Sequence, residues 1–194
     1  MGHDLRVLGV DPGLTRCGLG VVQGPASRPA PIAAEVVRTA RDLAVERRLM
    51  ELHDAVADAI ATHRPDVVAC ERVLFSSNAR TAMGVGQAAG VALLAAARAG
   101  VTVASYSPTD VKLTVAGHGA AGKEAVGRMV AAQLRLDVIG SPADLTDALA
   151  VALCHLVRAG GSVPSTGRHR GWEAVLQRPH LRVAGGTGPS GMAT

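Results

Sequence analysis

Short apolar runs alternate with stretches of helical periodicity along most of this chain. Apolar runs of strand length, bounded by Gly, Pro, Asp or Ser, occupy residues 5–10, 18–23, 32–39, 66–70 and 101–106. Residues 43–63 carry apolar side chains three and four positions apart, among them Leu49, Leu52 and Val56, which predicts a long amphipathic helix. The pattern therefore predicts three successive strands, a long crossover helix, and then strands that alternate with helices.

Helix signals are clearest in the second half of the chain. Residues 80–99 form a predicted helix of small residues that includes Gly84, Gly86 and Gly90, and Gly100 ends it. This glycine spacing favours either a helix contact in a dimer or close packing against the sheet. Ser-Pro pairs at 107–108 and 141–142 are typical N-cap and N1 residues. They predict a short helix to residue 115 and a last helix to about residue 158, with a further helix over residues 123–136 between them.

Beyond residue 158 the pattern changes to Gly, Pro, Ser and scattered Arg. We expect one domain over residues 1–158 and a disordered tail over residues 159–194, in which Trp172 is the only bulky anchor. The tail is either dispensable or a basic arm that touches nucleic acid. The longest uncharged apolar stretch, residues 88–97, is too short to span a bilayer, and the N-terminus lacks the features of a signal peptide. We expect a cytoplasmic protein with no membrane association.

Composition adds three constraints. The three cysteines, Cys17, Cys70 and Cys154, are far apart in the sequence and have no Cys-x-x-Cys spacing, so we expect buried, reduced thiols rather than disulfides or a zinc site. The net charge of +4 is compatible with a polyanionic partner but does not require one. Of 20 basic residues only Lys112 and Lys123 are lysine. They are either compact charges for a phosphate or chance positions on solvated helix faces.

Acidic residues end two of the apolar runs and open the last helix. Asp11 follows Val-Leu-Gly-Val, and Glu71 follows Asp-Val-Val-Ala-Cys. Asp144 and Asp147 lie three residues apart, so their side chains share one helix face near the positive end of the helix dipole. Four clustered carboxylates need cations, and their hard oxygen atoms suit Mg²⁺ or Mn²⁺. Two such ions can promote hydrolysis of a phosphodiester, so the acids favour a nuclease.

Two glycine-containing segments bear on nucleotide binding. The segment Asp11-Pro12-Gly13 with the following Gly18-Leu19-Gly20 resembles the opening hairpin shared by ribonuclease-H-like nucleases and actin-like ATPases. Actin-like ATPases need two such domains, and this chain has room for one. The segment from Gly117 to Lys123 matches a Walker A loop, but Glu124 replaces the Ser or Thr that would hold Mg²⁺. Because a predicted helix rather than a strand precedes this segment, we do not expect a nucleotide site.

Several separate motifs together resemble the RuvC family of Holliday-junction resolvases over about residues 5–158. They are Gly9-Val10-Asp11-Pro12-Gly13, Glu71-Arg72-Val73, Asn78, Gly86-Gln87-Ala88, Gly90, Val111-Lys112, Gly117 to Lys123, and Ala143 to Ala150 with Asp144 and Asp147. The resemblance implies a ribonuclease-H-like α/β fold with a mixed five-stranded sheet, three strands antiparallel and two parallel, flanked by helices. It also implies a crossover junction endodeoxyribonuclease that acts as a homodimer and nicks two opposed strands of four-way junction DNA in DNA recombination and DNA repair. The implied partners are the branch-migration motor proteins RuvA and RuvB.

The resemblance also assigns residue roles. Asp11, Glu71, Asp144 and Asp147 stand at the four catalytic, metal-binding positions, which implies two Mg²⁺ ions per site, with Mn²⁺ as the alternative. Lys112 and Lys123 fall at catalytic positions near the scissile phosphate. The family has an aromatic wedge shortly after the catalytic Glu, where this chain has Leu74 and then Phe75, its only phenylalanine. We assign DNA binding to Phe75 because a base can stack on its ring, and also to Arg72, Arg80 and the two lysines.

Two functions of other classes remain as alternatives. A non-catalytic junction-binding module would keep Phe75 and the basic residues but would tolerate loss of a carboxylate such as Asp147. A small actin-like ATPase would bind nucleotide and ignore DNA. Junction cleavage that depends on Asp11 distinguishes the nuclease from both.

Overall fold

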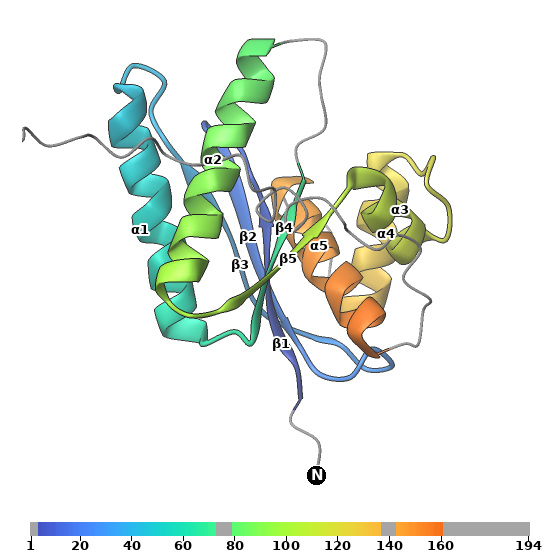
Figure 1. Cartoon of the computed structure of the whole chain (residues 1–194). Helices are drawn as coiled ribbons and strands as arrows, with labels where there is room; N and C mark the ends of the chain where they lie inside the picture. The colour runs from blue at the N-terminus through green and yellow to red at the C-terminus, as the bar shows by residue number, and fades with distance from the viewer. Residues whose placement is uncertain (1–3, 73–78, 137–142, 161–194) are drawn as a thin grey trace, which may run out of the picture. The chain divides into compact units, whose positions relative to one another are not determined.

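The computed structural model describes residues 4–72, 79–136 and 143–160, and for residues 79–80 and 143–144 it describes the backbone only. The elements in chain order are β1 (Arg6–Asp11), β2 (Arg16–Gln23), β3 (Ala30–Arg38), α1 (Val45–His63), β4 (Val67–Glu71), α2 (Ala79–Arg98), β5 (Thr102–Tyr106), α3 (Pro108–Ala116), α4 (Lys123–Leu134) and α5 (Ala143–Gly160) (Figure 1). The predicted Ser141–Pro142 cap and the predicted tail lie outside the described residues. The described residues belong to one compact unit.

The five strands form one mixed sheet in the order β3-β2-β1-β4-β5. Strands β1, β2 and β3 pair antiparallel, whereas β4 and β5 continue parallel to β1. This confirms the predicted sheet of three antiparallel and two parallel strands. Strand β3 begins two residues earlier than the apolar pattern indicated and contains Pro31. Proline is tolerated there because β3 lies at the sheet edge, where a missing N–H leaves no neighbouring strand unpaired.

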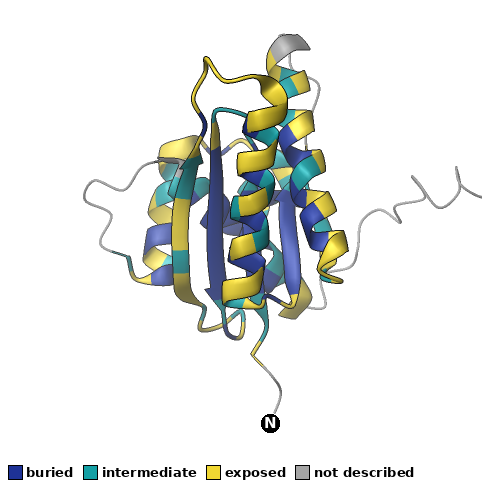
Figure 2. Ribbon diagram, turned by 90° about the vertical axis from the view of Figure 1, so that its left-hand side faces the viewer, coloured by how far each residue is buried: buried dark blue, intermediate teal, exposed yellow. Residues whose placement is uncertain are grey.

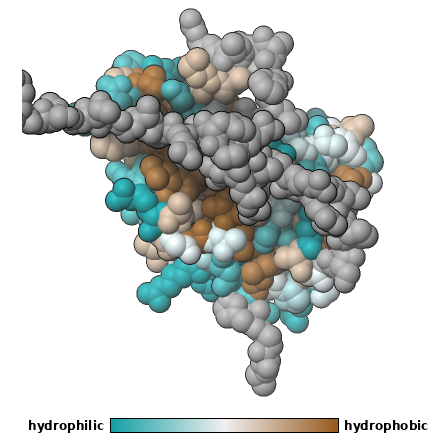
Figure 3. Space-filling model, viewed as in Figure 1, coloured by the Kyte–Doolittle hydropathy of each residue, from teal (hydrophilic) through white to brown (hydrophobic). Residues whose placement is uncertain are grey.

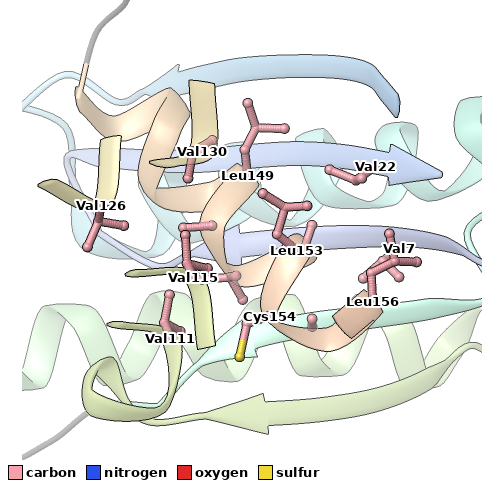
Figure 4. Packing of buried hydrophobic residues seen from close by; sticks show 14 of the residues in the cluster. Val7, Val22, Val111, Val115, Val126, Val130, Leu149, Leu153, Cys154 and Leu156 are labelled. Atoms are coloured by element: carbon pink, nitrogen blue, oxygen red, sulfur yellow. The ribbon is translucent and has the colours of Figure 1, made fainter. Parts of the chain in front are cut away.

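Each face of the sheet carries its own apolar core. Helices α1 and α2 cover one face, and α3, α4 and α5 cover the other (Figure 1). Figure 2 shows the central strands buried and the outer sides of the helices exposed. On the second face the core is built by side chains from all three helices and from β1 and β2, as Figure 4 shows for Val7, Val22, Val111, Val115, Val126, Val130, Leu149, Leu153, Cys154 and Leu156.

Local sequence explains where α3 and α4 begin and end. Ser107 caps α3 in a capping box, in which its hydroxyl accepts a hydrogen bond from Asp110 N and the Asp110 carboxylate accepts one from Ser107 N. Gly117 ends α3 with a left-handed backbone (φ 80°), and Gly122 is the N-cap of α4. The Walker-like segment therefore joins two helices, as the sequence indicated, and lacks the preceding strand of a phosphate-binding loop.

No helix in the described ranges is both long enough and apolar enough to cross a membrane. All three cysteines are free and buried, as predicted. Burial is the main reason that the pKa of Cys17 and of Cys70 rises to about 12. These thiols therefore act as small apolar side chains in the core.

Candidate active site

Two of the predicted catalytic acids stand level at the ends of neighbouring parallel strands. The register pairs Val10 of β1 with Cys70 of β4, so the next residues, Asp11 and Glu71, lie side by side across the two strands. Adjacent strands are about 4.8 Å apart, and alternate residues face the same side of a sheet. Ala69 packs in the core under α5. Gly9 also faces α5, so Asp11 and Glu71, two residues further on, face that helix as well.

Two glycines let α5 approach the sheet at this point. Gly9 and Gly20 are cross-strand partners in β1 and β2. A Cβ atom at Gly9 would lie 2.7 Å from the backbone nitrogen of Ala152, and one at Gly20 would lie 2.9 Å from that of Leu149. Both distances are shorter than real Cβ contacts, so only glycine fits at either position. The close approach brings the first half of α5, and with it Asp147, against the ends of β1 and β4.

The electrostatics of Glu71 show that the predicted charged residues act on one another. Burial raises the pKa of Glu71, and the Asp147 carboxylate raises it further. The ammonium groups of Lys123 and Lys112 oppose these effects and lower the pKa. A cation near Glu71 and Asp147 would relieve the repulsion between the two carboxylates.

Lys123 already supplies part of that positive charge. Its Nζ atom lies 3.0 Å from Oδ2 of Asp147. The Lys123 side chain is 78% exposed, whereas that of Asp147 is 20% exposed. Lys123 thus lies on the solvent side of the pair. Lys112, on α3, is partly buried.

The side chains of three predicted site residues lie outside the described part of the structure. Asp144 lies in the first turn of α5, three residues before Asp147, but its side chain is not described. The same holds for the side chain of Arg80 in α2, and Phe75 lies outside the described residues. Arg72 is exposed directly after Glu71, and its backbone nitrogen donates a hydrogen bond to Tyr106 O. Among the described side chains, no three His, Cys, Asp or Glu groups are placed to hold a metal ion.

The donor set nevertheless fits a divalent cation in its chemistry. Asp11, Glu71 and Asp147 offer only carboxylate oxygens, the ligands that Mg²⁺ and Mn²⁺ prefer. Two of the three are brought together by strand register and the third by the docking of α5. Metal binding by these residues remains a prediction.

Sequence reasoning missed a polar network beside the acids. Tyr106 of β5 is in register with Glu71, and its hydroxyl lies 2.7 Å from Nδ1 of His155 on α5. Arg158 of α5 lies over the Tyr106 ring and binds Asp110 of α3. The capping-box spacing of Ser107 and Asp110 could have indicated one member. Nothing in the sequence pairs residues 48 positions apart, as Arg158 and Asp110 are.

A second missed residue, Arg48 of α1, holds the turn that follows Asp11. Although it is only 8% exposed, its guanidinium donates hydrogen bonds to the hydroxyls of Thr39 at 2.9 Å and Thr15 at 2.7 Å. The Thr39 hydroxyl in turn donates to Leu14 O at 2.6 Å. An arginine within an amphipathic helix pattern gives no sequence signal of such a role. This buried network fixes the β1–β2 turn beside the acids.

Comparison with known proteins agrees with this geometry. The family model described as crossover junction endodeoxyribonuclease RuvC matches residues 7–155. A relative from Rhodococcus jostii, named crossover junction endodeoxyribonuclease RuvC, is 53% identical over 156 residues, which cover 80% of this chain and 82% of the relative.

Solved structures give the same result. Thermus thermophilus RuvC, solved in complex with a Holliday junction substrate, matches with a TM-score of 0.76 and 40% identity over 80% of this chain and 95% of that one. The yeast mitochondrial Holliday junction resolvase Ydc2 matches with a TM-score of 0.57 and 13% identity over 79% of each chain, a likeness of fold alone.

Fold and acidic strand ends together define a ribonuclease-H-like nuclease. The family match covers residues 7–155, which is most of the chain. This chain belongs to the RuvC family of crossover junction endodeoxyribonucleases. Nucleases of this family depend on divalent metal ions.

Proposed function

We propose that this chain resolves four-way DNA junctions by paired hydrolytic nicks, with two divalent ions held by Asp11, Glu71, Asp144 and Asp147. The observation that carries the proposal is the level position of Asp11 and Glu71 at the ends of adjacent parallel strands, beside an α5 whose Asp147 raises the pKa of Glu71. Mg²⁺ is the proposed ion, with Mn²⁺ as the alternative, because both take carboxylate oxygens. When bound, such ions would activate a water molecule and stabilise the leaving oxygen.

The chain's own residues would bind and orient the DNA. Lys123 is exposed and already within ion-pair distance of Asp147, so it can exchange that carboxylate for a phosphate oxygen when DNA arrives. Lys112 acts on Glu71 from α3 and would offset phosphate charge from that side. Phe75, Arg72 and Arg80 lie in or next to the segment between β4 and α2. We assign base stacking to Phe75 and phosphate contact to the two arginines.

A homodimer would supply the second active site that paired nicking needs, and we place its interface on α2. Gly86 and Gly90 have no atom within 4 Å of an added Cβ, so among the described residues they do not pack against the sheet. Met83, Leu93 and Leu94 on the same helix are 65%, 37% and 52% exposed. Figure 3 shows apolar side chains gathered over α2 and the adjoining edge of the sheet at β5. A second copy of α2 would cover these side chains and could approach closely at the two glycines.

Such an activity belongs to DNA recombination and repair. We propose that it acts in the cytoplasm, where bacterial chromosomal DNA lies, together with the branch-migration motor proteins RuvA and RuvB. Support for this setting comes from membership of the RuvC family.

Cleavage of a synthetic junction tests the proposal. The full chain is incubated with a labelled four-way junction or a linear duplex, with MgCl₂ or EDTA, and compared with Asp11→Asn. We expect symmetric nicks in the junction alone, only with Mg²⁺, and none from Asp11→Asn. Asp58→Asn, an exposed acid on α1, is the matched control and should cut at the wild-type rate. Junction binding without cutting would favour a binding module, and ATP hydrolysis in a parallel assay would favour an actin-like ATPase.

A further inference from the structure

Helix α3 carries Lys112 but has little apolar surface to hold it in place. It has nine residues, and only Val111 and Val115 are buried. Helices this short are marginal without tertiary contacts. The direction of the Lys112 side chain therefore depends on what fixes the rotation of α3 about its own axis.

Arg158 of α5 forms hydrogen bonds to one edge of α3. Its Nη2 atom donates to Oδ1 of Asp110 at 3.0 Å, and its Nε atom donates to Oγ1 of Thr114 at 3.1 Å. Asp110 and Thr114 are one helical turn apart, so both hydrogen bonds reach the same edge of the helix. The guanidinium also lies over the ring of Tyr106, 5.5 Å from its centroid, which ties the contact to β5.

Lys112 leaves α3 on the opposite edge. At about 100° per residue, Lys112 lies roughly 160° to 200° around the helix from Asp110 and Thr114, and Val111 and Val115 lie between the two edges. A roll of α3 that releases the Arg158 edge would therefore swing the Lys112 edge relative to Glu71. The Asp110 carboxylate is also part of the capping box, so the Arg158 hydrogen bond to Asp110 lies at the junction between β5 and α3.

We propose that Arg158 is a positioning residue for Lys112: it fixes the roll of α3 and so holds the Lys112 ammonium toward Glu71 and the scissile phosphate. This inference rests on the role that the proposed function gives to Lys112. Among the described side chains, Arg158 contacts Asp110 and Thr114 of α3 and the Tyr106 ring, and none of these is a proposed metal ligand.

A double-mutant cycle in single-turnover cleavage tests the inference. The full chain, saturated with junction and MgCl₂, is compared as wild type, Arg158→Met, Lys112→Ala and the double variant. We expect Arg158→Met to slow cleavage about tenfold, as a sub-ångström misplacement would, with junction Kd unchanged within about twofold. In the Lys112→Ala background the same change should alter the rate less than about twofold, because the lysine that Arg158 positions is gone.

Conservative variants keep the test open if Arg158→Met does not fold. Arg158→Lys keeps the charge but cannot span Asp110 and Thr114, so its cleavage rate should lie between those of wild type and Arg158→Met. Thr114→Val removes one of the two hydrogen bonds and should have a smaller effect of the same kind. Arg128→Met is the matched control: Arg128 is an exposed arginine on α4, 3.9 Å from Glu124, and the variant should cut at the wild-type rate.

The outcomes separate this inference from the proposed function. If Lys112→Ala cuts at the wild-type rate, the role of Lys112 is wrong and the positioning role of Arg158 fails with it. If Lys112→Ala is slow but Arg158→Met is not, only the positioning role is overturned. An equal loss from Arg158→Met in both backgrounds would mean that Arg158 acts on the fold generally, which also overturns it.

Discussion

Gly9→Ala is the sharpest test of how the packing of α5 against the sheet positions Asp147. The new Cβ atom would lie 2.7 Å from the backbone nitrogen of Ala152 and closer still to the carbonyl oxygen of Ala148. Both are backbone atoms, so no side-chain rotation can relieve the overlap. Ordinary contact begins at 3.4 Å. The helix and the sheet must therefore separate by about 0.7 Å at Ala152, and by more at Ala148, the immediate neighbour of Asp147.

The size of both effects follows from this displacement. Overpacking a well-packed core costs roughly 1–3 kcal/mol, and each kcal/mol lowers the Tm of a chain of this size by about 2–4 °C. A catalytic group misplaced by about 1 Å can cost on the order of 10²-fold in rate. We therefore expect Gly9→Ala to cut junctions tenfold to a hundredfold more slowly, roughly speaking, at temperatures where it is still folded.

Two assays separate the loss of stability from the loss of geometry. Thermal unfolding followed by circular dichroism gives the change in Tm. Single-turnover junction cleavage is measured at least 15 °C below the lower Tm, where the free energy of unfolding is still about four kcal/mol or more. Gly20→Ala should show the same effects more weakly, because its nearest backbone contact, to Leu149 N, is 2.9 Å.

A glycine with room for a methyl group is the control. A Cβ atom at Gly127 of α4 would meet Thr146 Oγ1 at 3.8 Å, an ordinary contact. Gly127→Ala should stabilise the helix by about 1 kcal/mol and leave cleavage unchanged. If Gly9→Ala keeps both the wild-type Tm and the wild-type rate, α5 does not depend on Gly9 for its position and the account of the site is refuted.

Three further predictions use the pKa shifts. Burial, and then Asp147, raise the pKa of Glu71, so its stabilising contribution is present below its unfolded pKa and lost as pH rises through its folded pKa. Above that pKa, Glu71→Gln should raise the Tm in EDTA and remove the stabilisation by Mg²⁺, and a lower Tm in EDTA would contradict this. The hydrogen bond from Ser107 is the largest cause that lowers the pKa of Asp110, so its contribution is present above the unfolded pKa and lost as pH falls through the folded one. Denaturant unfolding should show Asp110→Asn costing about 1 kcal/mol at pH 7 and progressively less as pH falls through the folded pKa of Asp110. All three buried cysteines should resist Ellman's reagent at pH 8 in the folded chain and react once it is unfolded, because burial raises the pKa of Cys17 and Cys70 to about 12; rapid labelling of the folded chain would show that the core opens easily.

The sequence alone predicted the elements and the candidate site residues. Apolar runs bounded by turn residues predicted all five strands, and Ser107 with Pro108 predicted the start of α3. Asp11 and Glu71 were recognised because each ends an apolar run, and strand ends are where ligands of α/β sheets gather. These signals are local: they depend on side-chain periodicity and capping between residues close in the chain.

Only the tertiary structure decided how these residues meet. Pairing of Val10 with Cys70 set Asp11 level with Glu71, and the glycines of β1 and β2 let α5 bring Asp147 to them. In the glycine-rich helix, a Cβ atom added at Gly86 or Gly90 would meet no described atom within 4 Å, whereas one at Gly84 would contact Leu14 at 3.5 Å. The hydrogen bonds from Arg158 to α3 likewise join residues far apart in the chain. Register, helix docking and long-range polar contacts depend on which backbones can approach one another, and local periodicity does not contain that information.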